Sequence, residues 1–381
     1  MAYDKVVDSA ALDSKLTQVA DAIRTKGNTS ADLQFPSGFI SAIQAIQTGT
    51  ELKIVVSVTS GATVTATKGS KVVSGTSVNG TCTLTVPEAG TWSVKATLGG
   101  ETSNTKSVTF TDSYDVTLAF VSPTLNDNDW AKIREVSDKG DGANYWSIGD
   151  RKAVTLNGTV GQLSLSNYTT YAFIIGFNHN AELEGQNRIH FQLGKTALSG
   201  GTDVALCDGY YSTIDSINGF EIDHKGTSYG GWASSHMRTE ICGTNLSNYS
   251  GTIIAVIPSA LRSVLKSVTK YTDNNGGGSG SVASAITATT DYFFLLSEFE
   301  VSGSITTSNG YERDKQAQYS YYSAGNSKIK YKYNEMSTAV WWWLRSPSSN
   351  SYESFLAVMS NGTCLNYKVD CSWGFAPGFC V

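Results

Sequence analysis

The sequence predicts an α+β protein that is mainly β, with helices at the N-terminus, a small β-sandwich after them and a large aromatic domain at the C-terminal end. Apolar residues recur at helical spacing near the start of the chain, and alternating strand patterns follow. Charged residues make up only 16% of the chain, while Gly, Ser, Thr, Asn, Tyr and Trp are plentiful, which favours strands and loops. Because single cores stop growing well before 381 residues, more than one domain is expected.

Residues 1–50 are expected to form a helical attachment or oligomerisation segment. An amphipathic helix is predicted over residues 10–26, and a second, shorter helix after Pro36. The stripe of the first helix is formed by Leu12, Leu16, Val19 and Ile23. Two helices of this size cannot bury their apolar faces alone, so a partner surface is expected. The sequence leaves the oligomeric state open, and a homotrimer is one candidate.

Residues 51–114 predict an immunoglobulin-like β-sandwich. Short alternating strands are separated by Gly-rich turns at the spacing typical of such a fold. Because the turns contain no recognisable site, this module is interpreted as a spacer. The remaining residues, 115–381, hold nearly all the tryptophans and are interpreted as one domain. Within it we predict a helix over 258–272, a flexible loop over 274–281 and a strand over 292–301.

Composition argues against several classes of partner. The net charge of -5 comes without a dense basic stripe, so nucleic acid is not expected to bind. The sequence has no apolar run long enough for membrane insertion, and no cleavable export signal is expected. The six cysteines contain no CxxC pair, which favours free or buried thiols over disulfides, although a bridge between Cys371 and Cys380 remains open.

Catalytic residues are not expected, and neither is a cofactor. The four histidines are spread through different segments without the spacing of a metal motif, so we expect no metal site of that kind. His190 is interpreted as a core residue, and His236 as a cap of local turns. Carboxylate pairs could still hydrolyse a glycoside, a hypothesis that concerns Asp208, Asp223, Glu298 and Glu300. A structural calcium ion in the loop 126–129 is also left open.

Six ordered segments of the last domain resemble a family of bacterial and phage proteins with a C-type-lectin-like fold. They are residues 146–150, 184–195, 232–238, 291–300, the motif WWLRSP at 342–347, and 374–381. The ending is similar to variable proteins of diversity-generating retroelements, which display hypervariable residues between WWLRSP and the terminal motif. Many such proteins have an Arg before the closing Pro, where this chain has Ala376. Residues 16–43 also resemble a segment at the start of phage tail and baseplate-associated proteins.

These resemblances imply a non-enzymatic receptor-binding protein of a virion, with a variable region at about 341–373. The implied partners are phage tail or baseplate proteins and a bacterial cell-surface protein or glycan, which would be bound without a metal. Three alternatives stay open: a bacterial surface adhesin, a structural tail component without a ligand, and a glycan hydrolase.

The composition of residues 348–373 also favours binding. Ser, Asn and Tyr are abundant there, as in antibody paratopes. Asn361-Gly362 predicts a hairpin, with Phe355 and Val358 facing inward. The expected contact set is Ser348, Ser349, Asn350, Tyr352, Ser354, Ala357, Met359, Thr363, Leu365, Asn366, Tyr367, Asp370, Cys371 and Trp373. Tyr352, Tyr367 and Trp373 are its expected anchors. Trp342, Leu344 and Arg345 are interpreted as scaffold.

Overall fold

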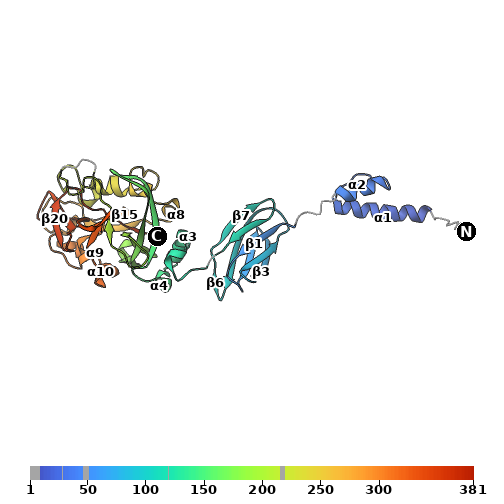
Figure 1. Ribbon diagram of the computed structural model, residues 1–381, viewed down its shortest axis with the longest axis horizontal. Helices are drawn as coiled ribbons and strands as arrows, with labels where there is room; N and C mark the ends of the chain where they lie inside the picture. Colours follow the sequence, from blue (N-terminus) through green and yellow to red (C-terminus); the bar gives the residue numbers. More distant parts are fainter. Residues whose placement is uncertain (1–8, 28, 46–50, 119, 215–218) are drawn as a thin grey trace. The chain divides into compact units, whose positions relative to one another are not determined.

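The chain folds into two compact units, residues 1–120 and 121–381 (Figure 1). The computed structural model describes residues 9–27, 29–45, 51–118, 120–214 and 219–381. Strands hold more of the chain than helices do, and helices stand at the N-terminus, which confirms the prediction of a mainly β protein with N-terminal helices. Among the residues described, no helix has the length and apolar character needed to cross a membrane.

Two helices open the first unit. They are α1 (Ser9–Gly27) and α2 (Ser37–Ala45). Ile23 of α1 and Phe39 of α2 are buried together in a small core. Leu12 and Val19, which belong to the predicted apolar stripe, remain exposed. The two helices therefore cover only part of their apolar surface with each other.

The rest of the first unit consists of two sheets around one hydrophobic core. Its strands are β1 (Lys53–Ser57), β2 (Thr63–Lys68), β3 (Lys71–Thr76), β4 (Thr81–Thr85), β5 (Gly90–Leu98), β6 (Glu101–Thr102), β7 (Lys106–Phe110) and β8 (Tyr114–Thr117). One sheet has the order β4-β1-β8, and the other has the order β3-β2-β5-β6 with β7 also paired to β5. Ile54, Val64 and Trp92 are fully buried between them. Strand β8 pairs with β1 and extends beyond residue 114, where the sequence placed the end of this module.

A five-stranded sheet forms the centre of the second unit. Its strands are β9 (Arg151–Val160), β10 (Leu163–Phe177), β11 (Ile189–Lys195), β15 (Phe293–Phe294) and β21 (Gly378–Cys380), in the order β15-β21-β11-β10-β9. All neighbouring pairs are antiparallel. Helix α3 (Trp130–Asp138) packs on this sheet through Trp130, whose ring contacts Phe191 and Phe379 edge-on.

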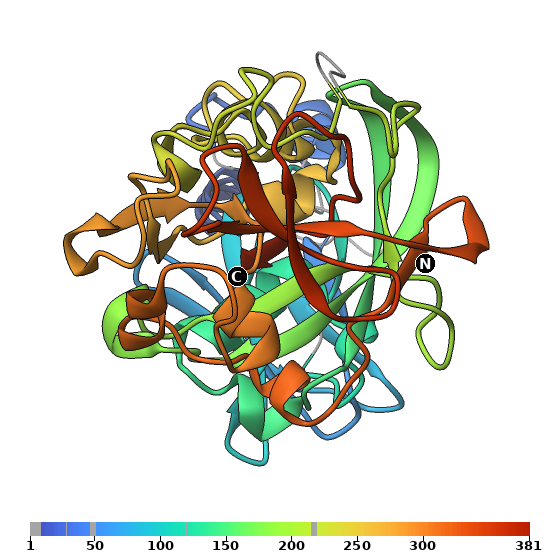
Figure 2. The same ribbon diagram turned by 90° about the vertical axis from the view of Figure 1, so that its left-hand side faces the viewer.

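Three smaller sheets complete the second unit. They are β12-β16-β17 (Val204–Ala205, Lys330–Lys332, Glu335–Val340), β13-β14 (Val268–Asp273, Ile286–Asp291) and β18-β19-β20 (Trp342–Pro347, Ser354–Val358, Cys364–Lys368). The short helices are α4 (Gly142–Tyr145), α5 (Ala181–Glu184), α6 (Gly231–Ser234), α7 (Ile253–Val256), α8 (Ser259–Arg262), α9 (Glu298–Ser302) and α10 (Ser320–Ser323). Strand β20 lies on the side of this unit away from α3, and Figure 2 faces that side.

Two predicted elements differ from the structure. The helix expected over 258–272 ends at Arg262, and the chain continues as strand β13, because Val268, Thr269 and Thr272 are β-branched. The strand expected over 292–301 covers only Phe293–Phe294 and is followed by α9. That helix starts with a capping box in which Ser297 and Glu300 bond each other's backbone N–H groups.

Candidate functional site

Strand β18 lies beneath the predicted contact surface, and we call it the supporting strand. All six of its residues are buried. The indole of Trp342 donates to the Lys328 carbonyl, and that of Trp343 donates to the Phe220 carbonyl, both at 2.9 Å. Leu344 is fully buried beside them. The guanidinium of Arg345 is also fully buried, so its charge must be compensated inside the protein.

Glu300 supplies the charge that compensates Arg345. Both carboxylate oxygens accept hydrogen bonds from the guanidinium, which also donates to the Thr272 hydroxyl at 2.8 Å. Lys270 donates to Glu300 at 2.9 Å and to Glu184 at 2.7 Å. Burial alone would raise the pKa of Glu300, but the Arg345 and Lys270 cations outweigh it and hold that pKa below its ordinary range. The network therefore ties β18 to β13, α5 and α9.

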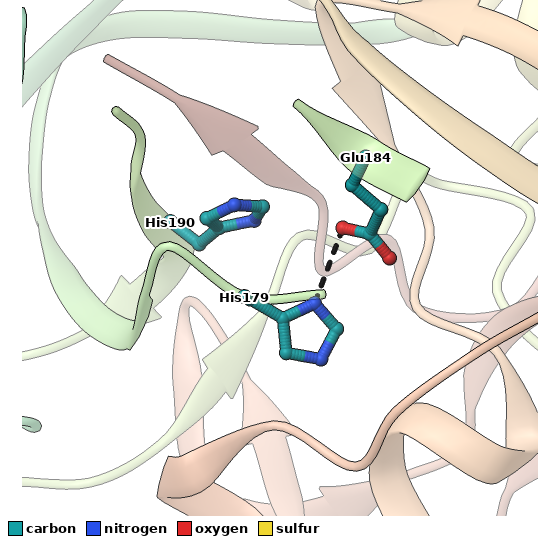
Figure 3. A group of neighbouring side chains, drawn as sticks. All are labelled: His179, Glu184 and His190. Carbon is teal, nitrogen blue, oxygen red and sulfur yellow. Dashed lines mark hydrogen bonds and ion pairs between the residues drawn. The ribbon is translucent and has the colours of Figure 1, made fainter. Parts of the chain in front are cut away.

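His179, Glu184 and His190 form a second part of this buried network (Figure 3). Nδ1 of His179 lies 3.1 Å from the Glu184 carboxylate, and its Nε2 lies 2.9 Å from the Ala317 carbonyl oxygen. The ammonium of Lys270 lies against the same carboxylate and so supplies the positive charge that a metal ion would bring. We therefore assign a structural role to this group.

His190 is fully buried in β11, as expected for a core residue. Its Nδ1 lies 3.1 Å from the hydroxyl of Tyr319 and 3.3 Å from the Cys380 sulfur. Its Nε2 has no hydrogen-bond partner in the described part of the chain. Burial and the charge of Lys270 lower the pKa of His190, so the ring stays neutral.

Glu312 is a buried carboxylate next to strand β18. It accepts from the Ser346 hydroxyl at 2.7 Å and from the Asp273 backbone N–H at 3.1 Å. Burial raises the pKa of Glu312 to about 7, because the two neutral donors do not offset the loss of hydration. Arg345 lowers that pKa to a lesser extent.

The structure places the predicted contact residues in three groups. Asn350, Tyr352, Thr363 and Leu365 are exposed. Met359, Asn366, Tyr367 and Asp370 are half-buried. Ser348, Ser349, Ser354, Ala357, Cys371 and Trp373 are buried, and their predicted outward orientation is wrong. For Ser354 and Ala357 the reason is that β19 lies between β18 and β20 and is covered on both faces, so that alternation produces no outward face. Ser348 and Ser349 are covered by the backbone of residues 307 and 308, to which they are bonded, and Cys371 and Trp373 belong to the hydrophobic core.

Trp373 is the centre of an aromatic cluster. It stacks on Trp341 with ring centroids 5.1 Å apart, and it contacts Tyr211 and Tyr367 edge-on at 5.3 and 5.2 Å. Trp341, Tyr211 and Tyr367 are half-buried, so each keeps part of its ring at the surface. Trp373, predicted to be a contact anchor, is thus buried beneath the three half-exposed rings that it contacts. Tyr211 comes from a segment that the sequence did not single out.

Strand β20 provides the exposed edge beside this cluster. The predicted hairpin at Asn361-Gly362 joins it to β19, and Gly362 has a positive φ of 86°. Leu365 is 40% exposed and pairs with Ala357 of β19. Tyr367, two residues further on, lies on the same side of the strand as Leu365. An apolar and an aromatic side chain are therefore presented together on an edge strand.

The Gly-rich segment 274–281 packs against the loop that carries Tyr352. The backbone N–H of Gly280 donates to the Ser349 carbonyl at 2.8 Å. Gly278 has a φ of +63°, and a Cβ placed there would lie 2.8 Å from the backbone of residues 351 and 352. The segment predicted to be a flexible loop therefore packs its backbone closely against the backbone of residues 349–352. Tyr352 itself is 51% exposed.

The carboxylates weighed for glycoside hydrolysis are engaged in local structure. Asp208 accepts from the Ser372 hydroxyl at 2.9 Å and from the Phe220 N–H, and burial raises its pKa. Glu298 accepts from the N–H groups of residues 306 and 308 at 3.0 Å. Asp223 accepts from the Lys225 N–H at 2.8 Å. Together with the ion pairs of Glu300, these bonds order loops.

Two further expectations concern the calcium loop and the cysteines. In residues 126–129, Asn126 accepts from the Ala153 N–H, Asn128 bonds to three backbone carbonyls, and Asp129 caps α3. These side chains bond the backbone, and the Lys152 ammonium donates to the carbonyls of Asn126 and Asn128 in the same loop. The six cysteines, all within the described ranges, are free thiols, so the bridge left open between Cys371 and Cys380 is not formed.

Comparison with protein families gives one match. Residues 220–381 are similar to a family described as a domain of unknown function, DUF6273. The matched stretch covers less than half of the chain, and it includes β18, β19, β20 and the terminal strand β21. No curated protein and no solved structure matches the chain.

Proposed function

We propose that the protein is a non-enzymatic receptor-binding protein of a phage tail, with a C-type-lectin-like second unit and an immunoglobulin-like spacer. Its ligand would be a bacterial surface protein or glycan, and a retroelement would diversify the outward residues of 348–373. The observation that carries the proposal is the aromatic and apolar surface of Trp341, Tyr367 and Leu365 above the fully buried supporting strand. A rigid supporting strand favours binding because little order has to be gained when the ligand docks.

Three further features support a display role. Tyr352 and Leu365 are large and exposed, which is typical of interaction surfaces. Strand β20 lies away from α3, which is near the start of the second unit, so this surface is remote from the point where the chain enters the unit (Figure 1). The exposed Leu12 and Val19 of α1 suit attachment to tail proteins or assembly as a homotrimer. In this proposal the protein binds its ligand without a metal ion or cofactor and does not convert the ligand chemically.

The test is attachment of the labelled full chain to a panel of bacterial strains. The variant combines Tyr352→Ser with Leu365→Ser, and the control combines Tyr311→Ser with Leu198→Ser, whose side chains are 44% and 47% exposed. The proposal is supported if the wild-type chain binds some strains and the variant's affinity for them falls at least about tenfold further than that of the control. Equal binding by variant and control would refute this surface as the contact.

A structural tail component is the second candidate, because Trp373 is buried and central to its cluster. Such a protein would bind none of the strains, and the variant would change neither binding nor melting temperature.

Sedimentation or light scattering of the full chain and of a truncation after residue 50 would test the homotrimer. The full chain should have about three times the monomer mass, and the truncation should contain fewer subunits.

A further inference from the structure

A separate group of ligand-type side chains lies apart from the buried ion network. One carboxylate oxygen of Glu221, one ring nitrogen of His224 and one ring nitrogen of His236 all lie within 4.8 Å of one another. Glu221 and His224 come from one short segment, while His236 immediately precedes the π-helical turn η2 (Met237–Cys242). Turns of this kind are rare and are frequently found at functional sites.

The ring of His236 hydrogen-bonds to the backbone of Gly219 but leaves one nitrogen, Nε2, without a partner among the residues described. Its side chain is only 9% exposed. It makes no capping bond to η2, so the predicted cap of that turn is not formed, and its ring bonds the backbone of the preceding loop at Gly219 instead. A buried nitrogen left without a partner is costly, so its position calls for a ligand that the protein itself does not supply.

The separation between Glu221 and His236 suits two ligands of one ion. Nε2 of His236 lies 3.7 Å from Oε1 of Glu221, which is too long for a hydrogen bond. Two ligands at about 2.1 Å from a tetrahedral zinc ion would lie roughly 3.4 Å apart, so only a small adjustment would be needed.

The group opens onto a surface pocket of about 420 Å³. His224 and His236 line it together with Gln162, Glu240 and Ser250. His224 is exposed, so an ion can reach the site from solvent. This distinguishes it from the group of His179, which is closed and already contains the Lys270 ammonium.

We propose that Glu221, His224 and His236 bind a transition-metal ion of the zinc type, with the remaining coordination position facing the pocket. Two imidazoles and a carboxylate are a donor set that suits zinc and the other late divalent ions of the first row. The site would also fix the chain next to the display region, because the N–H groups of Ile222 and Asp223 both donate to the Val369 carbonyl, at 2.9 and 3.1 Å. The proposal does not depend on the function proposed above.

Cobalt(II) is a suitable probe, because four-coordinate Co²⁺ absorbs visible light and can be displaced by Zn²⁺. The untagged full chain is titrated with Co²⁺, and the single variants His224→Ala and His236→Ala are compared with Ser250→Ala. Ser250 lines the same pocket but offers no ring nitrogen or carboxylate, which makes it a matched control. Because His224 is exposed, its replacement leaves the fold intact even if the change at His236 does not.

The expected result is one Co²⁺ per chain with a visible absorption that Zn²⁺ removes. Ser250→Ala should bind like the wild type, while each histidine variant should lose at least about 100-fold in affinity. The proposal is overturned if the wild type gives no such spectrum. It is equally overturned if His224→Ala binds as tightly as Ser250→Ala, since any bound ion would then lie elsewhere.

Discussion

Replacing Glu312 by Gln is expected to remove a pH-dependent cost to the stability of the second unit. The carboxyl group is fully buried, and its pKa rises from 4.5 to about 7 in the folded protein. The folded state therefore holds a proton that the unfolded state has lost between these two pH values. The free energy of unfolding must fall as the pH rises through this range, and it levels off above about pH 7.

The size of the effect follows from the shift of the pKa. A rise from 4.5 to about 7 corresponds to roughly 3 kcal/mol when each pKa unit counts for about 1.4 kcal/mol. Gln keeps the shape, accepts from the Asp273 N–H and donates to the Ser346 hydroxyl, but it does not titrate. The Gln variant should therefore gain stability relative to the wild type by about this amount between pH 5 and pH 8.

Urea unfolding followed by tryptophan fluorescence measures this difference, because seven of the eight tryptophans lie after residue 120. Comparing variant with wild type at each pH cancels the other titrating groups, including Glu300. The exposed Glu335 offers a matched control, Glu335→Gln, which should show no such trend. A difference between Glu312→Gln and wild type that stays constant from pH 5 to pH 8 would refute the reasoning.

Three further predictions concern the aromatic cluster, the buried charges and the thiols. Trp373→Ala should cost about 3–5 kcal/mol because it empties the centre of the aromatic cluster, whereas the exposed Tyr352→Ala should stay within about 0.5 kcal/mol; equal losses in urea unfolding would contradict the assigned burial. Lys270→Met should cost about 3–5 kcal/mol, since Glu184 and Glu300 lose a buried cation, and an unchanged urea midpoint would count against the network. A thiol reagent should react with six cysteines after unfolding but slowly with the native protein, because burial raises the pKa of Cys207, Cys371 and Cys380 to about 12; fewer than six would reveal a disulfide.

Local patterns predicted the parts of the fold that depend on local chemistry. Helical spacing located both N-terminal helices, and Asn361-Gly362 located the hairpin between β19 and β20. The capping box of Ser297 and Glu300 was also present in the sequence and could have identified α9. Alternation failed for β19, because whether a strand has one covered face or two depends on its neighbours in the sheet.

The buried network and the proposed metal site could not be predicted in the same way. Glu184, Lys270, Glu300 and Arg345 are separated by long stretches of sequence, and only the packing of several elements brings their charges together. His236 lies twelve residues after His224, a spacing that matches no short metal motif. Whether the two histidines come together depends on the path of the chain between β11 and β13.

Strand β21 has a consequence for how the second unit is made. It occupies an inner position of the five-stranded sheet, between β15 and β11, yet it follows every other strand in the chain. The sheet therefore cannot close on the ribosome until residues 378–380 have been synthesised and have left the exit tunnel. A frameshift or stop codon anywhere in residues 348–373 would remove β21, so the product would fail to fold. Only coding changes that keep the reading frame and create no stop codon would still give a chain that contains β21.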